Sequence, residues 1–152
     1  MREYPQRLHH ATPGWVGEGA LFHVRIRLAP EQSAQLTDSR LSAELIEAAK
    51  RYHKLGHWWC ELFLLMPDHV HALLRFPREP GIAAVLSNWK RGTARFQGMR
   101  WQDNFFDHRI RNKAEASEKW RYIRLNPVVT KLCAGEDDWS HWWSGITADK
   151  QT

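Results

Sequence analysis

The stretch that decides the fold lies near the middle of the chain and reads HWWCELFLL-MPD-HVHALLRF, residues 57–76. Two apolar runs, 57–65 and 69–76, flank Met66-Pro67-Asp68, where proline and aspartate favour a turn. The runs have the length and composition of strands, and a connection this short joins antiparallel neighbours. The stretch therefore predicts a β-hairpin.

The segment before the hairpin predicts a strand followed by a helix. Residues 20–28 alternate between apolar and polar side chains, which is the period of a half-buried strand. Its polar side carries His23, Arg25 and Arg27 and is basic. Residues 39–54 place apolar side chains at helical spacing, with Asp38 or Ser39 to cap the start and Gly56 to end the helix.

The segment after the hairpin predicts a second amphipathic helix over residues 80–97. Its apolar stripe consists of Ile82, Val85, Leu86, Trp89 and Phe96. Three cations, Lys90, Arg91 and Arg95, lie away from that stripe and make the outer face basic.

A fourth extended segment and a third helix follow, over residues 101–111 and from Asn112 onward. Asn112 and Glu115 have the spacing of a capping box, which opens a helix. We expect this helix to end at about Asn126, because Pro127 stops it. The remaining tail is rich in tryptophan.

The predicted order is strand, helix, strand, strand, helix, strand. This order is the ferredoxin-like split βαβ arrangement, an α+β fold in which two helices pack on one face of an antiparallel sheet. The third helix is appended, and the other sheet face is expected to be partly open. We expect residues 1–152 to form a single domain, because no repeat or low-complexity tract interrupts them.

Composition narrows the class of protein. The chain has 152 residues, of which 43% are hydrophobic and 26% charged, values typical of a globular protein rather than a disordered or fibrous one. Its net charge of +5 indicates an anionic partner such as nucleic acid. We expect a cytoplasmic protein, since the polar first residues 1–7 open no secretory signal and no apolar run is long enough to cross a membrane. Cys60 and Cys133 are interpreted as small core residues.

His69 and His71 are the first candidates for chemistry. They flank Val70 in a predicted strand, so the period of two places both imidazoles on one face, which Arg75 shares. This spacing suits two ligands of one divalent metal ion. The alternative is a pair of histidines that hold no ligand.

Tyr122 is the second candidate, on the third predicted helix beside the apolar positions Ala116, Trp120 and Ile123. Glu118 and Asn126 lie one helical turn before and after it, so the three side chains form a polar row. A phenol is a poor nucleophile unless a positive charge or a metal ion lies near it or near its target. The alternative is a packing tyrosine, and Glu118 is interpreted as a solvated side chain.

Four stretches of the chain carry a resemblance to a known family. Met66-Pro67-Asp68-His69-Val70-His71 resembles the metal-binding signature of the single-tyrosine transposases of the IS200 type, and residues 122–128 (YIRLNPV) are similar to their tyrosine segment. Residues 101–111 (WQDNFFDHRIR) resemble a stretch of the REP-associated branch, and residues 136–144 resemble its tail. The likeness runs from about Arg7 to Ser144. It departs at Arg124, where the family often has histidine or another polar residue, and at residues 129–132.

The resemblance implies an activity and a set of roles. It implies cleavage of single-stranded DNA at palindromic hairpins through a covalent 5′-phosphotyrosine, with Tyr122 as the nucleophile. It also implies a divalent ion, Mg²⁺ or Mn²⁺, on His69 and His71, with Asn126 matching the place of a third ligand. The REP-associated branch implies a monomer rather than the dimer common among IS200-type enzymes.

Basic residues are the candidates for DNA contact, because they can meet phosphates. They are Arg25, Arg27, Lys90, Arg91, Arg95, Arg109 and Arg111. Two other functions stay open: a hairpin-binding protein of transposase descent without cleavage, and a metal-dependent nuclease that hydrolyses DNA with water.

Overall fold

The computed structural model describes residues 13–17, 19–33 and 35–146. The expectation about the polar residues 1–7 lies outside these ranges. A short 3₁₀ helix, η1 (Gly14–Gly17), comes first. The elements that follow are β1 (Leu21–Arg27), α2 (Ser39–Leu55), β2 (Trp59–Met66), β3 (His69–Arg75), α3 (Ile82–Gln97), β4 (Phe106–Arg109), α4 (Lys113–Val129), the 3₁₀ helix η2 (Glu136–Asp138) and β5 (Trp142–Trp143).

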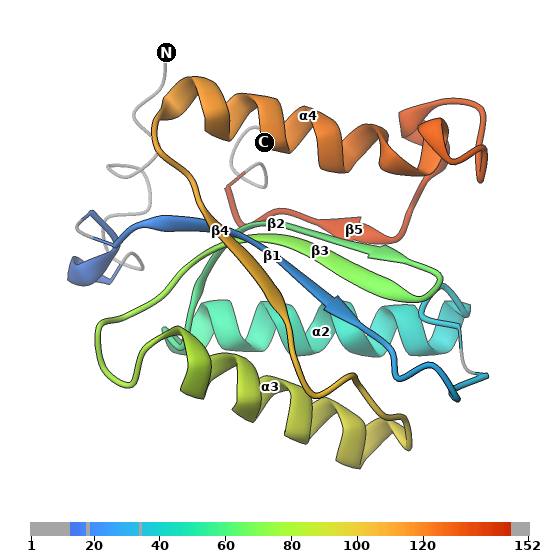
Figure 1. Ribbon diagram of the computed structural model, residues 1–152, viewed down its shortest axis with the longest axis horizontal. Coiled ribbons are helices and arrows are strands. Elements are labelled where there is room, and N and C mark those ends of the chain that lie inside the picture. Colours follow the sequence, from blue (N-terminus) through green and yellow to red (C-terminus); the bar gives the residue numbers. More distant parts are fainter. Residues whose placement is uncertain (1–12, 18, 34, 147–152) are drawn as a thin grey trace.

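The strands form one five-stranded sheet in the order β4-β1-β3-β2-β5, and each neighbouring pair is antiparallel. The first four strands have the ferredoxin-like order, so the predicted α+β fold is confirmed. Pro67 and Asp68 form the turn of the predicted hairpin between β2 and β3. Helices α2 and α3 lie on one face of the sheet and α4 lies on the other (Figure 1).

The larger core lies between the sheet and helices α2 and α3. Alternate residues of β1 and β3, among them Val24, Ile26, Val70 and Ala72, point into it and are at most 1% exposed. Asp38 caps α2 by accepting a hydrogen bond from the Leu41 N–H, as its sequence position predicts. The opposite residues of the same strands, including both candidate histidines, therefore face α4.

A smaller core joins the sheet to α4. It includes Leu62, Leu64 and Leu73 from the sheet and Ile123 from α4, with Trp120 partly buried beside them. Helix α4 thus covers part of the face that the sequence predicted to be partly open. It brings the segment around Tyr122 over the sheet.

The third helix extends past its predicted end. Pro127 lies inside α4 and is buried, and the helix continues to Val129. The proline withholds one N–H from the ladder, but the remaining half-turn is closed by Thr130, whose N–H and hydroxyl donate to the Asn126 carbonyl. Proline therefore precedes the helix end here instead of setting it.

Two other expectations were wrong in detail. Phe96 was placed in the apolar stripe of its helix but is 83% exposed. Its spacing from Trp89 is helical, yet Phe96 lines a groove of about 570 Å³ between α2 and α3, where no described residue covers its ring. The fourth extended segment forms a strand only at β4, with Trp101 making a single bridge to Leu28.

The tail after α4 returns to the sheet and adds strand β5 beside β2. The Trp139 indole N–H donates to the Leu65 carbonyl at 3.1 Å, and the guanidinium of Arg124 lies 3.9 Å from the centre of the Trp142 ring. Cys60 is buried and Cys133 is half-buried, and both are free thiols. The tail is therefore a structural part of the sheet edge.

Among the described residues, each helix is too short or too polar to span a lipid bilayer.

Candidate functional site

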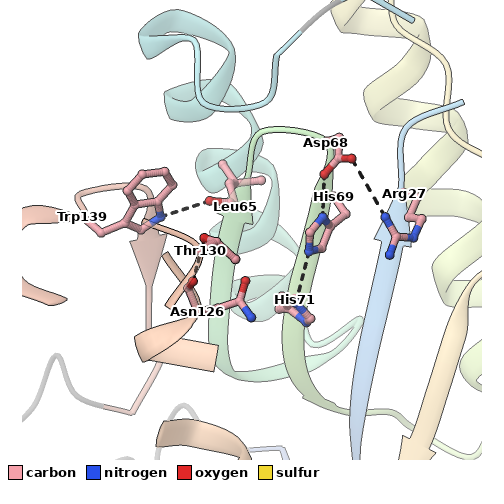
Figure 2. A network of polar contacts seen from close by, with 8 residues as sticks. All are labelled: Arg27, Leu65, Asp68, His69, His71, Asn126, Thr130 and Trp139. Atoms are coloured by element: carbon pink, nitrogen blue, oxygen red, sulfur yellow. Dashed lines mark hydrogen bonds and ion pairs between the residues drawn. The ribbon is translucent and has the colours of Figure 1, made fainter. Parts of the chain in front are cut away.

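The two candidate histidines begin β3, directly after the hairpin turn. The Nε2 atoms of His69 and His71 face each other at 3.2 Å. Asp68 accepts a hydrogen bond from Nδ1 of His69 at 2.7 Å (Figure 2), and the carboxylate also lies 4.0 Å from the Arg27 guanidinium. The turn residue thereby orients the first histidine of the pair.

The separation of the two nitrogens fits a metal site. Bonds of about 2.1 Å from one ion to two imidazoles, at angles of about 90–110°, place the nitrogens about 3.0–3.4 Å apart. A carboxylate on the far nitrogen of a ligating histidine is the usual outer partner of such a ligand, and Asp68 has that place. Within the described ranges, no cluster of three or more His, Cys, Asp and Glu side chains suits a metal ion.

A third histidine, His23 of β1, lies against the pair. Its Nε2 atom is 3.0 Å from Nδ1 of His71, and the two rings stack with centres 5.2 Å apart. His23 is only 4% exposed and His71 only 2%. The sequence placed His23 on the polar side of its strand but gave it no role, because its neighbours across the sheet depend on strand register.

Tyr122 belongs to α4 and lies close to the histidines of the sheet. Its ring centre lies 5.9 Å from that of His71 and 6.3 Å from that of His23, with the rings nearly perpendicular. The tyrosine side chain is 51% exposed, so α4 holds it over the histidines with one side open to solvent. The fold thus brings together residues that are far apart in the sequence.

Asn126 lies one turn after Tyr122 on the same helix. Figure 2 shows its side chain extending from α4 toward the strand that carries His71. Glu118, one turn before Tyr122, is exposed, as the sequence predicts. Of the two polar side chains one turn from Tyr122, the Asn126 amide therefore lies toward the histidines and the Glu118 carboxylate lies in solvent.

Burial keeps the three histidines neutral. It is the largest cause that lowers the pKa of His71 to about 2 and that of His23 to about 4. Burial also lowers the pKa of His69, against the opposing effect of its hydrogen bond to Asp68. An uncharged imidazole keeps a lone pair on one ring nitrogen, and a metal ligand requires such a lone pair.

Two arginines of the neighbouring strand β1 lie beside the histidine pair. In the pairing of β1 with β3, Arg25 is opposite His71 and Arg27 is opposite His69. The Arg25 guanidinium lies 4.7 Å from the centre of the Phe106 ring. This face of the sheet therefore combines neutral histidines with two cations, an arrangement suited to a phosphate group.

The N-terminus of α4 is attached to the sheet by Glu115. Its carboxylate accepts hydrogen bonds from the Arg111 backbone N–H at 2.7 Å and from His108 Nε2 at 2.8 Å. These bonds, the backbone one first, lower the pKa of Glu115 to about 2. Asn112 caps the helix through the Glu115 N–H. Asn112 thus caps the helix that carries Tyr122, as predicted, whereas the Glu115 carboxylate bonds to the Arg111 N–H instead of completing the predicted capping box.

Four of the remaining predicted DNA contacts lie away from the histidine face. Lys90, Arg91 and Arg95 lie on α3, which packs on the other side of the sheet, and the Lys90 ammonium donates to the carbonyls of Asp103 and Asn104 (Figure 1). Arg109 pairs with Phe22, whose side chain packs toward α2 and α3. Arg111 is exposed beside Glu115. The basic residues are therefore divided between the two faces.

Two other polar residues have structural partners. Arg75, which shares the histidine face, donates to the Glu61 carboxylate and to the Gly19 carbonyl. Arg124, the departure in the tyrosine segment, is 6% exposed and packs on Trp142. Both arginines stabilise the fold around the site.

Comparison with known proteins gives a likeness to a solved structure. No protein-family model matches the chain, and no curated protein matches it. Among solved structures, it is similar to a REP-associated tyrosine transposase bound to a REP hairpin, with a TM-score of 0.72 and 20% sequence identity. The match covers 88% of this chain and 80% of that one. The chain thus shares the fold of that transposase.

Proposed function

We propose that this protein cleaves and rejoins single-stranded DNA at hairpins, using Tyr122 as the nucleophile and a divalent metal ion. The observation that carries the proposal is the approach of the Tyr122 ring to within 5.9 Å of the His71 ring, beside two Nε2 atoms 3.2 Å apart. Packing of the hydrophobic core does not by itself require these polar groups on one half-open face of the sheet. The fold shared with a transposase bound to a REP hairpin supports hairpin DNA as the substrate.

The proposed step is a transesterification. The Tyr122 hydroxyl oxygen attacks the phosphorus, the bond from phosphorus to the 3′ oxygen breaks, and the 5′ phosphate stays on the tyrosine. The phenol proton passes to solvent, which reaches the half-exposed ring, and the departing 3′ oxygen takes up a proton. Attack by a 3′-hydroxyl on the phosphotyrosine reverses the step, so strands are joined without ATP.

The residues around the tyrosine have distinct tasks in this proposal. Mg²⁺ or Mn²⁺ would be held by His69 and His71, with the Asn126 amide oxygen as a further ligand. When bound, the ion supplies a Lewis acid for the negative charge that develops on the phosphate oxygens. Arg25 and Arg27 lie across from the histidines and bind the scissile phosphate or its neighbour.

The test is incubation of the full chain with 3′-labelled single-stranded hairpin oligonucleotides, in Mg²⁺, Mn²⁺ or EDTA, followed by denaturing electrophoresis. We expect a labelled protein–DNA adduct for the wild type and none for Tyr122→Phe, His69→Ala or His71→Ala. Tyr52→Phe is the matched control, because Tyr52 belongs to α2 on the other side of the sheet.

The other outcomes identify the alternatives. Cleavage that leaves no adduct and persists in Tyr122→Phe would establish the hydrolytic nuclease. Tight binding without cleavage on a panel of palindromes would establish a binding protein. Either result refutes the proposed mechanism.

A separate measurement locates the DNA. If the strand crosses the histidine face, Arg27→Ala weakens hairpin binding and reduces the slope of log affinity against log salt by about one. Arg91→Ala, on α3, is the matched control and leaves the slope unchanged. The reverse result would place the DNA on the α3 side, with Lys90, Arg91 and Arg95, and would refute the proposed path. Arg109 and Arg111 remain proposed contacts near the start of α4.

A further inference from the structure

Four side chains, from the hairpin turn and from strands β3 and β1, form an unbroken polar chain. Asp68 Oδ1 lies 2.7 Å from His69 Nδ1, His69 Nε2 lies 3.2 Å from His71 Nε2, and His71 Nδ1 lies 3.0 Å from His23 Nε2. Each contact joins a different pair of atoms, so both nitrogens of His69 and both of His71 are engaged. His23 ends the chain on the side away from the carboxylate.

The direction of these hydrogen bonds follows from the carboxylate. An ionised Asp68 only accepts, so Nδ1 of His69 carries the ring proton and its Nε2 is an acceptor. His71 then donates from Nε2 to His69, which leaves Nδ1 of His71 as an acceptor. His23 therefore donates from Nε2 to His71 in the arrangement without a metal ion.

Metal ligation requires the other tautomer of His71. Both Nε2 lone pairs of the histidine pair must be free, so the ring proton of His71 moves to Nδ1 and is donated outward. The group that receives it is Nε2 of His23, which has to change from donor to acceptor. Each ring keeps one proton throughout, since the proton of His23 also moves, from Nε2 to Nδ1.

We infer that His23 is a positioning residue that accepts the Nδ1 proton of His71 and so holds that ring ready to ligate a metal ion. The inference rests on the metal site of the proposed function. It adds His23 to that site as a partner of the ligand rather than as a ligand itself.

The residue type at position 23 suits this task. Lysine only donates and a carboxylate only accepts, whereas a neutral imidazole does either, depending on its tautomer. The ring is also held in place, because it stacks on His71 and contacts Phe106 and Tyr122 edge-on. Glutamine also offers both functions through its amide, so His23→Gln is the conservative variant, and His23→Phe fills the space without either function.

The first measurement is the binding of Mn²⁺ to the full chain without DNA, with electron paramagnetic resonance as the readout. We expect His23→Phe to raise the dissociation constant by about 10–100-fold, the usual effect of losing an outer partner of a ligand. His23→Gln should stay within about threefold of the wild type, which a merely space-filling role for His23 would not produce. His57→Phe, which removes an exposed histidine on the other side of the sheet, is the control.

The outcomes separate the inference from the proposed function. Equal Mn²⁺ affinity in His23→Phe and the wild type, with binding lost in His71→Ala, overturns the role of His23 and leaves the metal site standing. A wild type that binds no Mn²⁺ overturns both. Loss of affinity in His23→Phe and His23→Gln alike also overturns the inference, because the hydrogen bond would then not be the cause.

A second measurement needs no variant that has to fold. Nitrogen-15 spectra of the wild-type imidazoles, recorded with and without Zn²⁺, report which nitrogen carries each proton. We expect His71 to carry its proton on Nε2 without the ion and on Nδ1 with it. The same tautomer in both spectra would overturn the inference.

Discussion

The contact between Arg124 and Trp142 is expected to fasten the tail of the chain to α4. The guanidinium carbon of Arg124 lies 3.9 Å from the centre of the indole ring, and the arginine is 6% exposed. One of its nitrogens also lies 3.5 Å from the Glu136 carbonyl, at the outer limit of a hydrogen bond. The perturbation is Arg124→Met, which keeps most of the length of the side chain and removes the charge.

The expected magnitude follows from burial. A cation–π contact contributes about 0.5–1 kcal/mol at exposed sites and about 2 kcal/mol when both groups are desolvated. Here the arginine is buried and Trp142 is half-buried, so we expect a coupling of about 1–1.5 kcal/mol between them. At about 2–4 °C per kcal/mol for a chain of this length, the coupling corresponds to about 2–6 °C in Tm.

The assay is a double-mutant cycle of Arg124→Met, Trp142→Leu and the double variant, measured by urea unfolding. Arg121→Met is the matched control, because Arg121 lies on the same helix and is exposed. A coupling energy below about 0.3 kcal/mol would mean that the two residues act independently. That result would refute the role of Arg124 in holding the tail against α4. An equal loss of stability in Arg121→Met would refute it too.

Three further predictions concern backbone space and acid stability. Gly145→Ala should lower the free energy of unfolding, measured by urea titration, by about 1–3 kcal/mol. The added Cβ would lie 2.5 Å from the Cys60 carbonyl oxygen and 2.6 Å from the His53 ring. Gly17→Ala is the control and should be near neutral, because the space around that Cβ is open. Gly92→Ala should raise the free energy of unfolding by about 0.5–1 kcal/mol, since Gly92 is inside α3 with open space at its Cβ, and a lower thermal midpoint would contradict this. The depressed pKa of Glu115, about 2, makes its contribution to stability complete above its ordinary pKa of 4.5 and lost as pH falls toward 2. Glu115→Gln should therefore flatten the fall in stability across that window of an acid titration, and an unchanged curve would show that the carboxylate does not stabilise the start of α4.

Local patterns were enough to predict the main elements, because each has a strong period or a clear boundary signal. The alternation of residues 20–28 became β1, and the hairpin and both capping residues, Asp38 and Asn112, were confirmed. Strand β5 was not predicted, since two residues are too few to show a period. Two local rules failed because of the surroundings. Helical spacing placed Phe96 in the apolar stripe, but its ring lines an open groove. Proline was expected to stop the third helix, but Pro127 lies so close to the helix end that the last residues still form.

The candidate site was predictable only where its residues are local. His69 and His71 lie two apart on one strand, so the strand period alone places them together. His23 joins them only through the register of β1 with β3, and the approach of Tyr122 depends on the side of the sheet that α4 covers. Neither fact is contained in a window of neighbouring residues, and the resemblance to a family supplied the tyrosine but not His23.

Strand β5 has a consequence for how copies of the protein meet. A bare outer strand offers unpaired amide and carbonyl groups to any second chain, and long edges of this kind promote aggregation. Here β5 covers part of the outer side of β2, where the Leu65 N–H also donates to the His141 carbonyl and the Gly145 N–H to the Cys60 carbonyl. The opposite edge, β4, is short and carries Asp107 and Arg109. In the part of the chain that the structure describes, neither border of the sheet offers a long apolar template for strand exchange. Removing the tail would uncover the outer side of β2, and we expect this change to make the protein prone to self-association.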